Sequence, residues 1–201
     1  MRYRIAPIVS TAFLVCTVTA LSADARPAKS AKTAAKSDAT TLADKRFVKE
    51  AATGNMAEVE LGKLAAEKSS NEQVKAFGQR MVTDHGAAND SLKSLASTKQ
   101  VAVNSALDAK HKATYDRLSK LSGAAFDRAY VTDMLMDHKQ DVAAFRRHIK
   151  SGRDADIKAW ASNTLPTLED HLKSVQALHN EVVPASAKAG THHTTSATRT
   201  R

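Results

Sequence analysis

Residues 124–150 read "AAFDRAYVTDMLMDHKQDVAAFRRHIK", which is the pattern of one long amphipathic helix. The apolar side chains recur at steps of three and four residues, whereas a strand would show alternation. One polar residue, His138, falls on the same face. That face consists of Phe126, Tyr130, Met134, His138, Phe145 and Ile149. The segment therefore predicts a helix of about 27 residues with a histidine on its buried side.

Three further windows of the sequence have the same helical spacing. They cover residues 41–68, 71–97 and 154–183. The break "SSN" at 69–71 ends the first of these helices and provides an N-cap for the second. Ser151 and Gly152 separate the last two. A shorter helix is expected over 107–121, and Pro166 predicts a kink near Ser162.

Four long helices, each about 40 Å in length, favour a helical bundle. The links after the first and third long helices are short, so each pair is expected to be antiparallel. About 26 residues, including the short helix, connect the second long helix to the third. A segment of that length can cross from one end of the bundle to the other. We therefore predict an all-α domain over 40–183, a ferritin-like four-helix bundle with one long crossover.

Each long helix has one strong polar interruption near the middle of its apolar face. These residues are Glu58, His85, His138 and His171. At about 1.5 Å per residue, the two members of each antiparallel pair lie within roughly 5 to 8 Å in height. Three imidazoles and one carboxylate are therefore expected to converge in the core.

Converging nitrogen and oxygen donors are the means by which helical bundles build metal sites. Imidazole and carboxylate ligands suit a divalent transition metal: iron, copper, zinc, nickel or manganese. The histidines at 85, 138 and 171 each follow an aspartate directly. Asp84, Asp137 and Asp170 are therefore candidates for further ligands, or for acceptors that orient the imidazoles. The hypothesis is a metal site formed by Glu58, His85, His138 and His171.

A metal-free polar network accounts for the same four residues, because buried polar groups can fix the register of packed helices. The remaining histidines of the predicted domain, His111, His148 and His179, are expected at surface or boundary positions. The sequence contains no recognisable pairing of nucleophile and base and no glycine-rich phosphate loop. Enzymatic activity is therefore not expected from the sequence.

The N-terminus has the features of a secretory signal peptide. "MRYR" precedes an apolar run over 5–21, and small residues surround a cleavage position after Ala25. An uncleaved anchor is the alternative, because about 17 apolar residues are at the lower limit for a membrane span. The single cysteine, Cys16, lies in this run, so the exported chain has no disulfide. We expect a location in the periplasm or at the outer membrane.

Two segments rich in lysine, alanine, serine and threonine flank the predicted domain, over 26–39 and 184–201. Their composition predicts disorder. Of the 30 basic and 21 acidic residues, 21 and 19 lie in 40–183, so the domain is nearly neutral although the chain carries +9. A nearly neutral domain argues against nucleic-acid binding. The basic tails are expected to contact an anionic envelope surface or to remain solvated linkers.

Three blocks of the sequence resemble one known family. They are "FVKEAATGNMAEVELGKLAAEKSSNEQVKAFGQRMVTDH", "LSGAAFDRAYVTDMLMDHKQDVAAF" and "LPTLEDHL". Over about 45–182 the chain is similar to domain-of-unknown-function family 4142, exported bacterial proteins often labelled as outer-membrane proteins. The positions that match are Glu58, Glu60, Asp84, His85, Asp137, His138 and His171. The resemblance implies a ferritin-like bundle from a Gram-negative bacterium and brings no established activity.

The sequence departs from the ferritin-like di-iron pattern, which uses Glu-x-x-His on two helices. The residue three positions before each of the three candidate histidines is apolar: Val82, Leu135 and Leu168. Di-iron oxygen chemistry is therefore not expected from the fold. The prediction is a histidine-rich site for a single ion.

Overall fold

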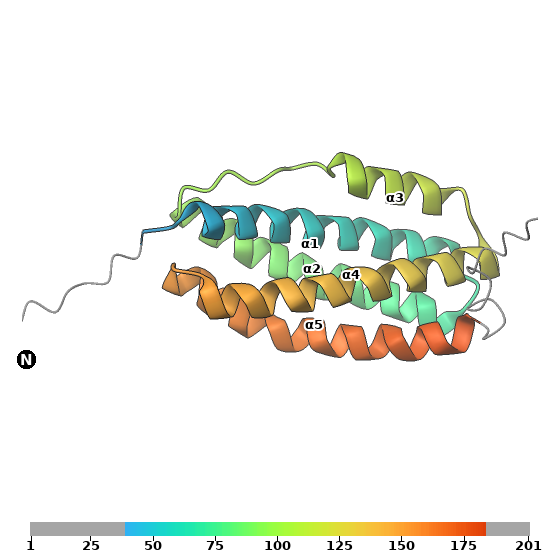
Figure 1. Ribbon diagram of the computed structural model, residues 1–201. Coiled ribbons are helices and arrows are strands. Elements are labelled where there is room, and N and C mark those ends of the chain that lie inside the picture. Colours follow the sequence, from blue (N-terminus) through green and yellow to red (C-terminus); the bar gives the residue numbers. More distant parts are fainter. Residues whose placement is uncertain (1–38, 184–201) are drawn as a thin grey trace, which may run out of the picture. The chain divides into compact units, whose positions relative to one another are not determined.

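The computed structural model describes residues 39–183, which form five helices and no strand (Figure 1). The helices are α1 (Leu42–Lys68), α2 (Glu72–Thr98), α3 (Ala109–Ser119), α4 (Gly123–Ser151) and α5 (Ala155–Val182). The all-α prediction is confirmed, and each predicted helix is present within a few residues of its expected bounds. The predicted signal peptide and both basic tails lie outside the described residues. Within 39–183, no helix is long and apolar enough to cross a membrane.

The four long helices form a bundle of two antiparallel pairs, α1 with α2 and α4 with α5 (Figure 1). The pairs meet where α1 packs on α4 and α2 packs on α5. The connection from α2 to α4 returns along the bundle and carries α3, which contacts α1 and α4. The predicted crossover is therefore present. The closer assignment to the ferritin-like arrangement stays a prediction.

Helix ends follow the capping signals of the sequence. Asn71 caps α2 by accepting two backbone N–H groups, as the break at 69–71 predicted. Thr41 and Asp44 form a reciprocal capping box at the start of α1. Gly152 follows the last residue of α4, as expected. Pro166 does not end α5, which is continuous, and the kink expected before it stays a prediction.

The backbones of α1 and α2 touch at two glycines. A Cβ atom on Gly62 would lie 2.5 Å from the carbonyl oxygen of Gly78, and one on Gly78 would lie 2.8 Å from the carbonyl oxygen of Gly62. Only residues without a side chain permit this approach. Glu58 lies one turn before Gly62 on α1, close to this crossing.

The apolar core is divided into two clusters. One contains Leu61, Leu64, Phe77, Met81, Tyr130, Met134, Val175 and their neighbours. The other contains Phe47, Val48, Leu92, Val142, Phe145, Ile157, Leu168 and their neighbours. On each of the four long helices, the predicted polar residue lies between the part that belongs to one cluster and the part that belongs to the other. A polar layer therefore crosses the middle of the bundle.

Candidate metal centre

The polar layer consists of four buried side chains, one from each long helix. Glu58, His138 and His171 have no exposed surface, and His85 is 2% exposed. One ring nitrogen of each histidine lies within 4.8 Å of a ring nitrogen of each of the other two. We refer to His85, His138 and His171 as the histidine triad. The residues that sequence spacing placed at similar height thus meet in the structure.

Glu58 lies against two members of the triad without forming a regular hydrogen bond. Its Oε2 is 2.8 Å from His85 Nδ1, and its Oε1 is 3.3 Å from His138 Nδ1. Despite these short distances, neither oxygen forms a regular hydrogen bond with a described residue. The two Nδ1 atoms instead form bonds elsewhere, with Asn55 and Met134. A fully buried carboxylate is therefore left with two free acceptors.

The hydrogen bonds of His138 and His171 fix the position of their ring protons. His138 Nδ1 is 3.0 Å from the carbonyl oxygen of Met134, which can only accept, so Nδ1 carries the proton. His171 Nε2 donates to the carboxylate of Asp84 at 2.8 Å. A neutral imidazole has one ring proton, so His138 Nε2 and His171 Nδ1 are left with lone pairs. These two atoms face each other at 3.4 Å.

His85 follows the same rule. Its Nδ1 lies 2.9 Å from the side-chain oxygen of Asn55, which assigns the proton to Nδ1. Its Nε2 is buried and has no hydrogen-bond partner in the described part of the chain. Each imidazole of the triad thus donates through one nitrogen and keeps a lone pair on the other. This is the state in which histidine binds metals.

Burial sets the charge of the layer. It lowers the pKa of His85 and of His171 to about 4, and it also lowers the pKa of His138. The three imidazoles are therefore neutral at neutral pH. Burial raises the pKa of Glu58 to about 7, and the nearby charge of Asp137 adds to the increase. The layer has little charge of its own and is shielded from solvent.

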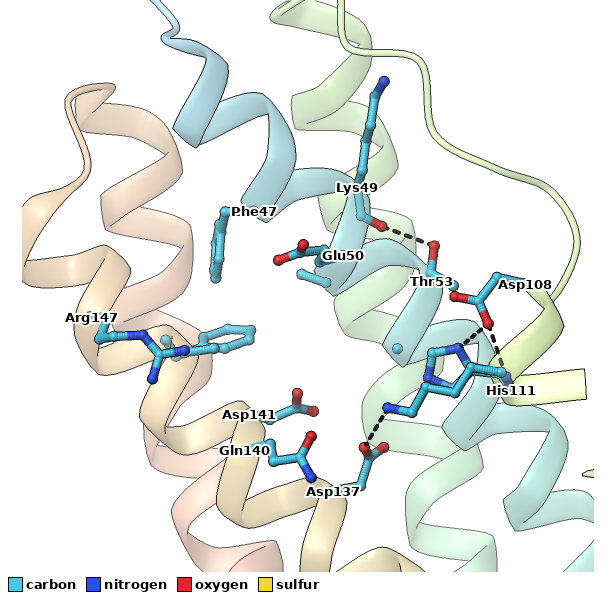
Figure 2. A pocket seen from close by; sticks show the side chains of 15 residues that line it. Phe47, Lys49, Glu50, Thr53, Asp108, His111, Asp137, Gln140, Asp141 and Arg147 are labelled. Atoms are coloured by element: carbon cyan, nitrogen blue, oxygen red, sulfur yellow. Dashed lines mark hydrogen bonds and ion pairs between the residues drawn. The ribbon is translucent and has the colours of Figure 1, made fainter. Parts of the chain in front are cut away.

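A second group of acids adjoins the layer. Carboxylate oxygens of Glu58, Asp137 and Asp141 all lie within 4.8 Å of one another. We call these residues the acidic trio. Asp137 and Asp141, one turn apart on α4, line a cavity of about 460 Å³ whose other walls come from α1, α3 and the residue before α3. Figure 2 shows both side chains pointing from α4 into this cavity. Glu58 therefore connects the buried triad to an open cavity.

The three aspartates predicted as supports occupy different positions. Asp84 orients a histidine, but this is His171 on α5 rather than its sequence neighbour. Asp137 belongs to the acidic trio and lies 3.9 Å from Lys110 Nζ. The expectation for Asp170 is wrong: its side chain is 56% exposed and pairs with Arg80 at 2.7 Å.

Sequence reasoning missed part of the layer. Asn55 holds His85, and its position three residues before Glu58 on one helix is a signal that could have identified it. Asp141, which follows Asp137 by four residues, is one of the more distant candidates that the sequence offers, with Glu60, Asp133 and Glu169. The expectation of a surface or boundary His148 is also wrong. This residue is 7% exposed and stacks on Phe47, with ring centroids 3.9 Å apart.

The sequence profile of a family described as "Domain of unknown function (DUF4142)" matches residues 28–178. The chain belongs to the DUF4142 family. This confirms the resemblance stated from the three sequence blocks. No curated protein matches this DUF4142 chain at a significant level.

Solved structures share the fold of this DUF4142 protein at low sequence identity. A DUF305 fragment from Deinococcus radiodurans is 13% identical, with a TM-score of 0.62 over 71% of this chain and 98% of that one. A putative secreted DUF305 protein from Streptomyces coelicolor is 14% identical, with a TM-score of 0.59 over 70% and 93%. CopM, solved in its Cu(I)-bound form, is 12% identical, with a TM-score of 0.59 over 70% and 98%. At these identities the likeness shows the fold alone.

Proposed function

We propose that this DUF4142 protein binds one transition-metal ion in the core of its bundle. The histidine triad provides three nitrogen ligands, and Glu58 provides an oxygen. The observation that carries the proposal is the contact of 3.4 Å between His138 Nε2 and His171 Nδ1. Both rings already donate their only proton to an outer acceptor, so two lone pairs face each other.

The cost of leaving this layer empty supports a cation. Each buried acceptor without a donor costs about 1–3 kcal/mol. His85 Nε2 and both oxygens of Glu58 are such atoms among the described residues. A metal ion on the lone pairs of the triad would satisfy His85 Nε2, and its positive charge would favour the ionised form of Glu58 beside it.

Copper is the first ion to test. Imidazole suits copper, zinc, iron and nickel, and at a site of this kind copper binds most tightly of the divalent first-row metals. The structure of CopM with bound Cu(I) shows that a protein with a similar fold binds copper. The described residues contain no cysteine, so thiolate coordination does not narrow the choice of metal.

We also infer that the protein is exported. The inference rests on the N-terminal pattern of basic, apolar and small residues. One structural neighbour is described as a putative secreted protein. The basic tails would then contact an anionic envelope surface in the periplasm or at the outer membrane.

A metal-free structural layer is the second candidate function. Its support is the pKa of Glu58, which burial raises to about 7. A protonated Glu58 would allow the four helices to bury the layer without an ion and to use it for register. Such a module would act through its surface and its tails.

Metal analysis of the full chain separates the two candidates. The chain is purified without an affinity tag, and metal content and melting temperature are measured with copper, zinc, nickel and iron. We expect about one ion per chain. Ion at about 100 times its Kd would add roughly 2.7 kcal/mol, or about 5–10 °C in melting temperature.

Two variants serve as matched controls. His138→Ala removes a triad imidazole, whereas His148→Ala removes another buried imidazole outside the triad. His192→Ala/His193→Ala removes the adjacent pair in the C-terminal tail. Binding should be lost only in His138→Ala. Equal binding in all three variants, or no ion and no thermal shift in the wild type, contradicts the metal proposal and favours the metal-free layer.

A further inference from the structure

We infer that the acidic trio of Glu58, Asp137 and Asp141 is a second cation site, which takes a hard divalent ion such as Mn²⁺, Mg²⁺ or Ca²⁺. It lies beside the triad site and shares Glu58 with it. The inference goes beyond the proposed function, because it assigns a different class of ion to a different set of ligands.

The trio brings together three acids from two helices. Their oxygens lie within 4.8 Å of one another although α1 supplies one carboxylate and α4 supplies two. Like charges at this distance repel each other strongly in a partly buried place. A divalent cation between the carboxylates would remove this repulsion.

Glu58 provides independent evidence for a ligand. Its side chain has no exposed surface, and neither of its oxygens has a hydrogen-bond donor within residues 39–183. A buried carboxylate is normally hydrogen-bonded or paired. Here its oxygens lie 2.8 Å from His85 Nδ1 and 3.3 Å from His138 Nδ1 without a regular hydrogen bond, and one of them also belongs to the trio. Because a carboxylate has two oxygens, Glu58 can serve a nitrogen site and an oxygen site together.

The cavity beside the trio gives an ion and its water ligands a route from solvent. It holds about 460 Å³ and is lined by Asp137 and Asp141, with Gln140 between them on α4 (Figure 2). Hard divalent cations require six or more oxygen ligands and keep several waters. Three carboxylates and an open side meet that requirement, whereas the closed triad does not.

The basic side chains around the cavity do not neutralise the three carboxylates of the trio. Lys110 Nζ is 3.9 Å from Asp137, and its side chain is 67% exposed. His111 is bound to Asp108 at 2.7 Å. Asp141 makes no hydrogen bond and no ion pair within the described residues, although Lys49 and Arg147 also line the cavity. Within the described residues, Lys110 makes the one lysine or arginine ion pair with the trio, and at 3.9 Å it is a weak competitor for a metal ion.

The two sites should select different ions because their ligands differ. Carboxylates and water suit Mg²⁺, Ca²⁺ and Mn²⁺, whereas imidazoles suit copper, nickel and zinc. Mn²⁺ is the best probe, because its aqueous signal in electron paramagnetic resonance disappears when the ion is bound. The full chain is stripped of metal and titrated with Mn²⁺.

Variants of the trio test which residues hold the ion. Asp137→Asn/Asp141→Asn is expected to weaken Mn²⁺ binding by about 100-fold, because ion affinity depends steeply on the number of charged ligands. Asp90→Asn/Glu181→Gln removes the same charge from two exposed positions that do not line the cavity and should bind like the wild type. Lys110→Gln should bind Mn²⁺ more tightly. Circular dichroism confirms that each variant is folded.

A second titration separates this inference from the proposed function. Wild-type protein carrying one equivalent of copper should still bind Mn²⁺, and so should His85→Ala/His171→Ala. Absence of Mn²⁺ binding in the wild type, equal binding in Asp137→Asn/Asp141→Asn, or loss of the Mn²⁺ site on copper loading would overturn the second site. Absence of copper, zinc, nickel and iron binding with retained Mn²⁺ binding would instead contradict the proposed function alone.

Discussion

Two regions of the bundle bury carboxylates completely and differ in how they satisfy them. At one end, Asp154 has no exposed surface, and it accepts hydrogen bonds from two backbone N–H groups and the hydroxyl of Thr40. Lys99 also pairs with it at 2.9 Å. In the middle, Glu58 is equally buried and accepts no regular hydrogen bond. Burial alone would raise the pKa of both acids. The bonds of Asp154 lower its pKa on balance, whereas that of Glu58 rises to about 7.

The comparison shows that burial by itself does not identify a functional acid. Asp154 caps α5 and pairs with Lys99, so its neighbours account for every oxygen it buries. Glu58 lies among imidazoles whose own donors point elsewhere. Acceptors that remain without donors distinguish the middle of the bundle from its end. These acceptors are what a cation would need.

Removal of the end carboxylate should have the largest effect on stability. Asp154→Ala loses an N-cap, worth about 1 kcal/mol, and breaks a buried ion pair, so we expect roughly 3 kcal/mol lower free energy of unfolding by urea denaturation. Because the folded pKa of Asp154 lies below the unfolded value of 3.8, its carboxylate stabilises the fold above pH 3.8. This stabilisation is lost as the pH falls through the folded pKa. Asp156→Ala, at a side chain that is 68% exposed, should cost much less. Equal losses of stability in Asp154→Ala and Asp156→Ala would show that the buried capping carboxylate contributes no more than an exposed one.

Neutralising Glu58, the carboxylate in the middle of the bundle, should instead increase the free energy of unfolding when no metal is present. A carboxyl with a raised folded pKa gives stability at low pH that is lost as the pH rises from 4.5 through about 7. With a chelator present at pH 8.5, Glu58→Gln should therefore be more stable than the wild type by about 2 kcal/mol. Denaturation of both proteins between pH 4.5 and 8.5 isolates this effect, because the triad histidines contribute to the pH slope of both. The same slope with pH in both proteins would contradict a buried carboxyl with a raised pKa.

Asp84 should affect metal binding more than stability. Asp84→Asn keeps an oxygen near His171 Nε2 but removes the charge that supports the ring. Loss of such an outer partner lowers metal affinity by about tenfold. A competition titration with a chromophoric chelator measures the change. Unchanged affinity would indicate that His171 is not a ligand.

Asp170→Asn provides the smallest expected effect and a matched control for Asp84→Asn. Both aspartates contact Arg80, but only Asp84 contacts a histidine. Because Asp170 is an exposed partner in a surface ion pair, its substitution should change neither stability nor metal affinity measurably. A loss of affinity similar to that in Asp84→Asn would contradict the assigned difference between the two residues.

The contrast between Asp84 and Asp170 also shows where sequence reasoning stops. Each residue directly precedes a triad histidine, so periodicity alone treats them alike. In an α-helix, consecutive side chains point about 100° apart, so the residue directly before a buried histidine lies to one side of the buried face. Asp84 points toward α5, where His171 lies, whereas Asp170 points toward solvent and Arg80. The rotation of each helix about its axis depends on packing that no single helix encodes.

His148 illustrates the same limit at the end of the bundle. Its place in the last turn of α4, beside basic residues, favoured a surface or boundary position. The structure instead stacks it on Phe47 of α1, with Asp44 Oδ1 3.5 Å from its Nε2. The partner lies about a hundred residues away in the chain. Spacing within one helix contains no information about such a contact.

The sequence by itself determined that the chain forms long amphipathic helices and that each of four carries one polar group near its middle. It did so because helical periodicity is local and a rise of 1.5 Å per residue converts position into height. Tertiary structure decided the rest. The packing of the helices determines which ring nitrogens keep their lone pairs and why Glu58 forms no regular hydrogen bond. It also brings Asp137 and Asp141 of α4 close to Glu58 of α1. Those properties depend on the rotation and contact of neighbouring helices, which arise only when the bundle packs.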